Sequence, residues 1–246
     1  MTNRTAIIIC SYNMPEYTDA LYEHIVKTVH VPYDLIIVDN GSDIAEPSKY
    51  TTFAIPENVQ TTQGFLQGYE FADSLRKDYF AYWHIITSTK FNKYDTRDIL
   101  APMLDVLEND SKAYAVSPAM VFGYDQAWSR IMTPRGAGIR KENNIDYIAS
   151  VFRADYFNQI GRFRPELTMM WGVVGECNWK ARKAGYNLYV HDDYFMYKDT
   201  NVGYNMHRMN MSVDDRTHSA SAEADRVLVP IYGEDFRKRH WHEYPR

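Results

Sequence analysis

The sequence predicts an α/β protein built on a central, mostly parallel β-sheet with helices on both of its faces. Three observations predict this class. Short β-branched runs alternate with amphipathic segments through the first half of the chain. Strand, helix and strand follow one another within about 35 residues, the pattern of a βαβ unit with a right-handed crossover. The 246 residues are also enough to bury a sizeable core.

The first βαβ unit has the clearest pattern. The apolar run 5–10, "TAIIIC", predicts a buried strand that ends in a polar turn. Leu21, Ile25 and Val29 then fall at helical spacing, which predicts one apolar helix face. The run 33–39, "YDLIIVD", predicts a second buried strand that ends in an Asn-Gly-Ser turn.

The rest of the chain continues this alternation less regularly. We expect a strand at 51–55, a helix within 61–77, a strand at 79–86, a helix over 95–109, a strand at 113–121, a strand and a helix across 145–163, and a helix ending at Gly185 before a strand at 186–191. Residues 123–145 predict a long loop or hairpin, either over a site or as a plain connection.

Composition narrows the class of protein and its compartment. The net charge of −5 is not typical of a bulk nucleic-acid binder, although it leaves room for a local basic patch. The only two cysteines, Cys10 and Cys177, give no disulfide framework, which favours a reducing, cytoplasmic location. We expect no transmembrane segment and no signal peptide, because no apolar run approaches the ~20 residues of a membrane span.

Polar residues follow the first two predicted strands. Ser11, Tyr12 and Asn13 come after the first, and Asp39 closes the second. Because ligands of parallel sheets bind beyond the carboxyl ends of the strands, these turns predict a binding edge. Asp39 is placed to accept hydrogen bonds from a base N–H or from ribose hydroxyls. The Asp-Asn-Gly-Ser sequence is a good turn in any case, and only its pairing with the first turn strengthens the interpretation.

These two stretches, "IIICSYNMPE" and "DLIIVDNGSD", resemble the turns of the glycosyltransferase family 2 superfamily. The resemblance continues in "ENVQTTQGFLQGYEFA", where Asn58, Gly64, Gly68 and Ala72 match an Asn/Gly-rich loop that opens a helix. It resumes in "ASVFRADYFNQIGRFRPEL" and in "WGVVGECNWKARKAGYNLYVHDDYFMYK", so that it covers roughly residues 5–200. The first two motifs together are specific, whereas the later ones are degenerate.

The resemblance implies a GT-A-type, Rossmann-like αβα sandwich that transfers a sugar from a nucleotide-sugar donor, a UDP-sugar, to a hydroxyl acceptor with inversion. We expect one domain over 1–246, with a nucleotide-sugar-binding half (1–120), an acceptor or catalytic half (121–200) and a C-terminal tail or lid (201–246). The residues expected to hold the donor are Cys10, Ser11, Tyr12, Asn13, Glu16, Asp39, Gly64, Thr87, Ser88 and Thr89.

The sequence departs from the family where a metal ion usually binds. Family members present an Asp pair after the fourth strand, whereas this chain has Thr87, Ser88 and Thr89 there. Neutral hydroxyls are poor ligands for Mg²⁺ or Mn²⁺. Lys198 approaches the position of the family's metal-binding His, and an ammonium can take the electrostatic role of a cation beside a phosphate. We therefore expect no required cofactor and catalysis assisted by Lys198.

Several alternatives remain open for the cation site. His207 or Arg208 is a further candidate to assist Lys198 at the phosphates. The alternative to a metal-free site is a divalent cation, Mn²⁺ or Mg²⁺, with Asp192 and Asp193 as its ligands. Histidines elsewhere, such as His84, are not at metal-ligand spacing and are expected to be structural.

The predicted catalytic base is displaced as well. The family's usual acidic pair falls on Val173 and Val174, and the next acid is Glu176 at a helix start, which we take as the candidate base. Trp171 and Gly172 beside it are the candidate acceptor-binding residues, with the indole as a stacking platform.

The acceptor and the oligomeric state are left open. The acceptor class is a glycan, a small molecule, a protein or a nucleic-acid base. The basic tail around Arg237, Lys238 and Arg239 is most simply a solvated end. The competing interpretation is a non-catalytic relative that binds nucleotides or glycans, because the acid pair, the His and the usual base are all missing.

Overall fold

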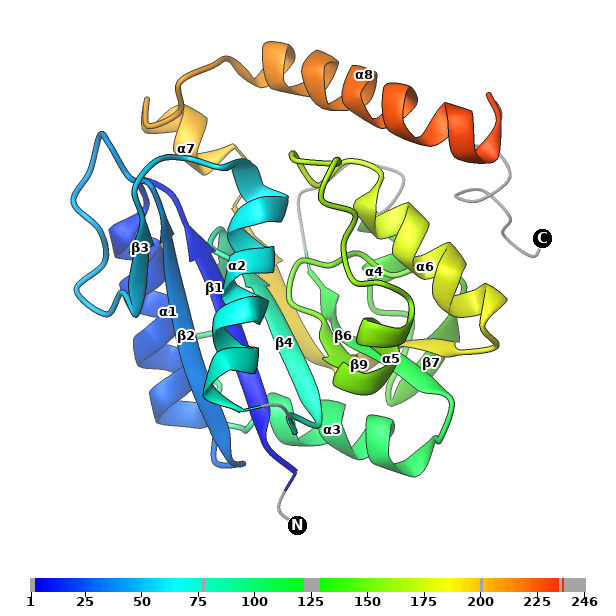
Figure 1. Cartoon of the computed structure of the whole chain (residues 1–246). Helices are drawn as coiled ribbons and strands as arrows, with labels where there is room; N and C mark the ends of the chain where they lie inside the picture. The colour runs from blue at the N-terminus through cyan, green and yellow to red at the C-terminus, as the bar shows by residue number, and fades with distance from the viewer. Residues whose placement is uncertain (1–2, 77, 122–128, 200, 235, 237–246) are drawn as a thin grey trace.

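Figure 1 shows the computed structural model of the chain, in which residues 3–76, 78–121, 129–199, 201–234 and 236 are described. A nine-stranded sheet lies at the centre, with the order β3-β2-β1-β4-β8-β6-β9-β5 and with β7 paired to β9.

The bounds of the elements follow the chain. The strands are β1 (Thr5–Ser11), β2 (Tyr33–Asn40), β3 (Phe53–Ile55), β4 (Ala81–Ile86), β5 (Thr89–Lys90), β6 (Ala113–Met120), β7 (Ile139–Glu142), β8 (Val151–Arg153) and β9 (Asn187–Lys198). The helices are α1 (Pro15–Thr28), α2 (Gln60–Leu75), α3 (Leu100–Asn109), α4 (Ser129–Met132), α5 (Ala154–Gln159), α6 (Val173–Lys183), α7 (Val202–Asn205) and α8 (Val213–Tyr232).

The predicted α/β class with a mostly parallel central sheet is confirmed. Strands β3, β2, β1 and β4 run parallel to one another, and β6 runs parallel to β9. Strand β8 lies antiparallel between β4 and β6 and joins the two parallel groups. The carboxyl ends of β1, β2 and β4 therefore lie at one edge, which Figure 1 shows below α7 and α8.

The two faces of the sheet bury separate cores, because alternate side chains of a strand point to opposite faces. In β1, Ile7 and Ile9 belong to the core shared with α1 and α3. Ala6 and Ile8 belong to the core shared with α2, α5, α6 and α8. Helices thus cover both faces, as the βαβ pattern predicts.

Helix α3 begins later than the sequence analysis predicted. It was expected from residue 95, but it starts at Leu100. The Asp98 side chain accepts hydrogen bonds from the amides of Leu100 (2.8 Å) and Ala101 (3.0 Å), and so satisfies the first donors of the helix. Asp95 instead forms an ion pair with Arg97 in the preceding turn.

The expected strand that starts at residue 145 is largely irregular. Only Val151–Arg153 are β8, although the chain before them follows β4 through backbone bonds from His84 to Ser150 and from Ile86 to Ile148 (2.9 Å each). Where a loop or hairpin was expected, residues 129–145 hold α4 and β7, and β7 pairs antiparallel with β9. Residues 123–128 lie outside the described residues.

The C-terminal segment contains a 20-residue helix, α8, that the sequence analysis did not predict. Ser212 caps it by accepting a hydrogen bond from the Asp215 amide, and Ala220, Ala224 and Leu228 form its buried stripe. Helix α8 crosses above the carboxyl edge of the sheet and then above α6 (Figure 1). The basic residues 237–239 lie outside the described residues.

None of the helices in the described part of the chain is both long and apolar enough to cross a membrane.

The packing of α2 on the sheet gives a test of the fold. A Cβ on Gly68 meets the Ile8 Cγ2 methyl at 2.7 Å and the Val38 Cγ2 methyl at 3.1 Å. We expect Gly68→Val to lower the free energy of unfolding by about 2 kcal/mol or more through overpacking. Glu70→Val, an exposed position on the same helix, is the matched control and should change it by about 0.5 kcal/mol or less. Urea unfolding midpoints measure both, and equal losses would contradict this packing.

Candidate functional site

The side chain of Asn13 organises the turns at the carboxyl edge of the sheet. Its backbone is left-handed (φ 56°), a conformation that Asn tolerates better than most residues. Its Oδ1 accepts hydrogen bonds from the amides of Asp43 (3.0 Å), Ile44 (2.9 Å) and Ala45 (3.1 Å). Its Nδ2 donates to the Asp43 carboxylate (2.9 Å) and to the Arg208 carbonyl (3.2 Å). Asn13, predicted to hold a donor, therefore shapes the edge itself.

Asp39 closes β2 at the same edge and is almost fully buried. Its carboxylate accepts hydrogen bonds from the Ser42 hydroxyl (2.5 Å) and amide (3.0 Å), which form the turn that its sequence predicts. The Ser42 oxygen in turn accepts the Asn13 amide (2.8 Å). A carboxylate has about four acceptor positions, and these two bonds use two of them.

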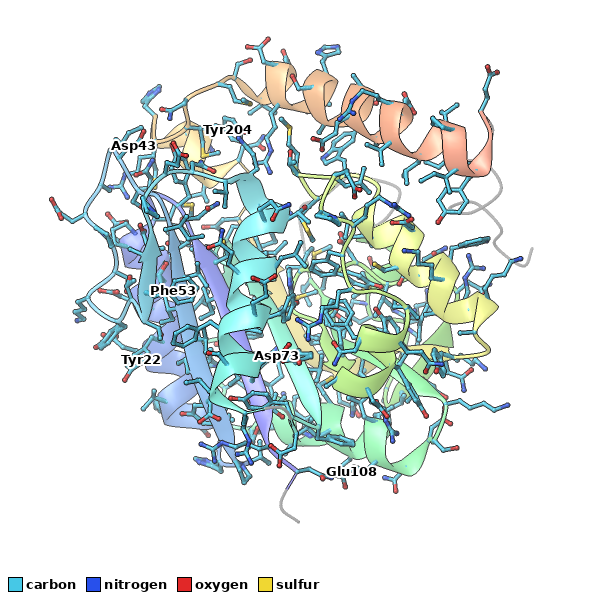
Figure 2. All side chains as sticks on the ribbon, in the orientation of Figure 1. Tyr22, Asp43, Phe53, Asp73, Glu108 and Tyr204 are labelled. Atoms are coloured by element: carbon cyan, nitrogen blue, oxygen red, sulfur yellow. The ribbon has the colours of Figure 1, made fainter. Side chains whose placement is uncertain are left out.

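The C-terminal segment lies across this edge. We call residues 206–212, between α7 and α8, the strap. Arg208 of the strap forms a bidentate pair with Glu16 (2.7 and 2.8 Å), which lowers the Glu16 pKa. Asn210 donates to the Tyr12 hydroxyl (2.8 Å) and to Asp43 (3.2 Å). Figure 2 shows Asp43 and Tyr204 at the same end of the molecule. The strap thus contacts two predicted donor residues, Tyr12 and Glu16.

The Thr87-Ser88-Thr89 turn follows β4, and two of its hydroxyls hold the backbone. Thr87 Oγ1 donates to the Cys10 carbonyl (2.6 Å) and Thr89 Oγ1 to the Ile148 carbonyl (3.3 Å). Ser88 is half-buried, and no side-chain hydrogen bond of its hydroxyl is found among the described residues. Of the three predicted donor contacts, Ser88 is the one whose hydroxyl is placed to donate to a ligand.

Cys10 and Gly64 lie beside this turn and face each other. A Cβ on Gly64 would lie only 2.5 Å from the Cys10 sulfur, so the glycine permits α2 to approach β1. Burial, with a smaller effect of Asp39, raises the Cys10 pKa to about 12, and the thiol is therefore neutral and unreactive. If Cys10 and Gly64 contact a ligand, they do so through backbone groups.

Lys198 ends β9 and lies next to the Thr87-Ser88-Thr89 turn. It stands opposite Thr89 in the β5–β9 register, and the following amide, of Asp199, donates to the Ser88 carbonyl (3.0 Å). Burial lowers the Lys198 pKa, and the neighbouring charge of Arg216 lowers it further, while the Asp146 carboxylate raises it in part. The chain therefore places a half-buried lysine next to this turn.

Asp146 is a charged residue at this edge that the sequence analysis missed. It comes two residues before Ile148, whose carbonyl accepts Thr89 Oγ1, so it lies close to the turn. Burial raises the Asp146 pKa, and Lys198 lowers it in part. The sequence carries no local signal for this contact, because it depends on the pairing of residues 146–150 with β4.

Glu176, the predicted catalytic base, lies inside an ion cluster. It is 3% exposed, Arg164 binds its carboxylate through Nε (2.9 and 3.0 Å) and Nη2 (2.5 Å), and Lys180 lies 3.4 Å away. Tyr232 of α8 also donates to it (2.7 Å). Although burial alone raises the Glu176 pKa, the bonds from Arg164 and Tyr232 outweigh burial, and the pKa is lowered. These contacts speak against a base and for a structural link between α6 and α8.

The two predicted acceptor residues have different environments. Trp171 is 38% exposed, so its indole is available to a ligand. Gly172 is in the left-handed region (φ 83°) and precedes α6, and a Cβ there would meet Leu228 of α8 at 2.8 Å. Gly172 is therefore required for the close packing of α8, whereas Trp171 stays a candidate for stacking.

The alternative metal ligands do not lie at this edge. Asp192 is buried and its two oxygens accept from Arg140 Nε (3.0 Å each), while Asp193 faces His191 at 3.9 Å. No group of three or more His, Cys, Asp or Glu side chains suited to a metal ion occurs among the described residues. His84 is buried beside the Tyr69 hydroxyl (2.9 Å), and burial lowers its pKa to about 3, so it is structural. Within the described part of the chain, Asp192 and Asp193 therefore do not form a divalent-cation site together with a third such ligand.

Two helical features of the site also escaped the sequence analysis. The Ser212-to-Asp215 spacing is a helix-start signal, and Ala220, Ala224 and Leu228 repeat every four residues, so α8 was predictable. Arg216, one turn into α8, could not be predicted as a residue of the site, because its position over the edge depends on how α8 docks.

Comparison with known proteins supports the fold. No protein-family model and no curated protein matches the sequence. Among solved structures, the chain is similar to GalNAc-T7, crystallised with UDP, GalNAc and Mn²⁺, with a TM-score of 0.57, 8% identity, and coverage of 97% of this chain and 58% of that one. It is similar to residues 1–349 of S. aureus TarS with a TM-score of 0.54, 12% identity, and coverage of 97% and 77%.

These likenesses show that the chain has the mixed α/β fold of GT-A-type glycosyltransferases. At 8% and 12% identity they show the fold alone. The chain spans 58% of the length of the GalNAc-T7 chain. The resemblance to family 2 stays a prediction.

The ion cluster around Glu176 gives a second test. Because Glu176→Gln leaves Arg164 without its buried partner, we expect the free energy of unfolding to fall by about 3 kcal/mol at pH 7. The lowered pKa means that the stabilisation is present above the unfolded pKa, near ~4.3, and is lost as pH falls through the folded pKa. The difference between the two proteins in urea unfolding should therefore shrink in acid. Glu166→Gln, at an exposed position, is the control.

Proposed function

We propose that this protein is a glycosyltransferase that moves a sugar from a nucleotide-sugar donor, a UDP-sugar, to a hydroxyl acceptor. The GT-A-type fold supports the class of reaction, and the GalNAc-T7 structure with UDP supports the class of donor. The first two turns supply the nucleotide edge, where Asp39 accepts hydrogen bonds from the base or ribose.

The observation that carries the proposal is the position of Lys198. Lys198 ends β9 beside the Thr87-Ser88-Thr89 turn, where the family resemblance puts the diphosphate and its metal. Ser88 has a hydroxyl to donate there, and no cluster of three or more His, Cys, Asp or Glu suited to a metal occurs in the ranges that the structure describes. We infer that Lys198 and Ser88 stabilise the leaving diphosphate in place of a divalent cation.

The proposed reaction is a single displacement with inversion. The acceptor oxygen forms a bond to the anomeric carbon, and the bond from that carbon to the diphosphate oxygen breaks. The electron pair leaves with the diphosphate, where Lys198 offsets the developing charge. The acceptor proton passes to a base other than Glu176, whose oxygens are held by Arg164 and Tyr232.

Asp146 has a positioning role in this proposal. Burial and Arg216 both act against the charged form of Lys198, and the Asp146 carboxylate acts in its favour. Without that carboxylate the lysine would lose its proton at lower pH and could no longer offset the charge of a diphosphate.

The second candidate function is a non-catalytic nucleotide- or glycan-binding protein. The saturated Glu176 carboxylate favours it, because the family's acid is replaced here by a structural one. Both functions include nucleotide binding, so turnover separates them.

Release of UDP from several UDP-sugars, with and without EDTA, is the test of the function. We expect turnover that EDTA does not change. Because Lys198 carries the charge, Lys198→Gln should lower kcat about 100-fold, whereas Lys198→Arg should keep part of it. Lys112→Gln, at an exposed lysine, is the control. Binding of UDP without turnover would favour the second function, and loss of activity with EDTA would contradict the metal-free site.

The role of Asp146 predicts a shift in the pH profile. Lys198 must be protonated, so kcat/KM should fall as pH rises through the lowered pKa of Lys198. Because the Asp146 carboxylate raises that pKa, Asp146→Asn should move the alkaline limb to lower pH. The alkaline limb should be absent in Lys198→Arg, both with Asp146 unchanged and together with Asp146→Asn, since arginine stays protonated. An unchanged limb in Asp146→Asn would contradict the coupling.

A further inference from the structure

Arg216 on α8 is a cation beside the proposed diphosphate position. Its guanidinium donates to the Tyr204 hydroxyl of α7 (3.3 Å) and to Thr61 Oγ1 near the start of α2 (3.4 Å). Both bonds are long and go to neutral oxygens, so they hold the group only weakly. A guanidinium has five N–H donors, and these contacts leave most of them for a ligand.

The surroundings of Arg216 differ from those of the other arginines near the edge. Arg208 is paired with Glu16, and Arg164 with Glu176. Arg216 is half-buried, yet no carboxylate lies within 4.0 Å of it among the residues that the structure describes. A half-buried guanidinium that no carboxylate neutralises is free to pair with an anionic ligand.

Arg216 and Lys198 are electrostatically coupled. The charge of Arg216 opposes the protonation of Lys198, so the two cations lie near enough to repel each other. The Asp146 carboxylate acts in the opposite direction and raises the Lys198 pKa in part. A ligand with several negative charges that binds beside Lys198 would therefore interact with two cations at once.

We propose that Arg216 binds the diphosphate of the donor together with Lys198, so that α8 forms one wall of the donor site. This inference rests on the proposed function and adds a residue to it. The planar fork of arginine suits two phosphate oxygens at once, whereas Lys198 acts as a point charge.

The docking of α8 fixes where Arg216 lies. The Ser212 cap begins the helix one turn before Arg216, and Ala220, Ala224 and Leu228 bury the apolar stripe that follows. Glu223 accepts the Thr168 hydroxyl (2.7 Å) and joins the helix to the loop before α6. These contacts hold Arg216 over the edge before any ligand binds, which keeps the entropic cost of binding low.

Isothermal titration of UDP, UMP and uridine against three variants tests this role. The variants are Arg216→Gln, Arg216→Lys and, as a control, Arg226→Gln, which changes an exposed arginine on the same helix. We expect Arg216→Gln to weaken UDP binding about tenfold or more, because it removes charge-assisted hydrogen bonds to phosphate. Uridine binding should stay unchanged, UMP should lose less than UDP, and Arg216→Lys should recover part of the affinity. Arg226→Gln should bind all three as the wild type does.

Three outcomes would overturn the inference. If the wild type binds UDP and Arg216→Gln binds it equally well, Arg216 has no diphosphate role, and the proposed function stands. If Arg216→Gln weakens the binding of uridine as much as that of UDP, Arg216 has a structural role only. If Arg216→Gln folds poorly, the same comparison of UDP with uridine is made with Arg216→Lys. If the wild type binds no nucleoside diphosphate, the proposed function falls together with the inference.

Discussion

The structure of the binding edge depends on the side chain of Asn13. Its amide group accepts hydrogen bonds from three backbone amides of the turn after β2 and donates one to the carbonyl of Arg208 in the strap. Three segments far apart in the sequence, 11–13, 41–45 and 206–212, are therefore fixed relative to one another. Since each buried amide needs a partner, loss of this group would leave several polar groups unsatisfied at once. The position of Asp39, Tyr12 and the strap follows from it.

The strap transmits this constraint to the rest of the proposed site. Arg208 is tied to Glu16 of α1, and Ser212 at the end of the strap starts α8. Helix α8 is then held at its far end by the Tyr232–Glu176 bond to α6. A helix fixed at both ends has little freedom to turn, so Arg216 keeps its place above the edge. The ion cluster around Glu176 thus has a structural role, because it fixes the helix that carries Arg216.

The sequence predicted those parts of the molecule that depend on local patterns. The strand periodicity of β1 and β2, the α1 face and the two turns depend on residues close in the chain, and they were predicted correctly. Asp146 and Arg216 could not be predicted, because their position depends on the pairing of residues 146–150 with β4 and on the docking of α8. The contacts of Glu176 could not be predicted for the same reason. A helix-start acid has the same sequence signal whether it faces a substrate or an Arg164 supplied by another segment.

If side chains replace a divalent cation, as we propose, the site works differently from a metal site. In a metal site, the negative charges of the ligands surround the two positive charges of the ion. Lys198 and Arg216, in contrast, repel each other when no anion is bound. Asp146 reduces that repulsion, but a carboxylate close to a diphosphate also repels it. In the proposed site the arrangement is a compromise, in which Asp146 favours the protonated form of Lys198 and the two cations together interact with the diphosphate. Proton affinity and ligand affinity are coupled at this edge, and a divalent metal site would not couple them through a lysine.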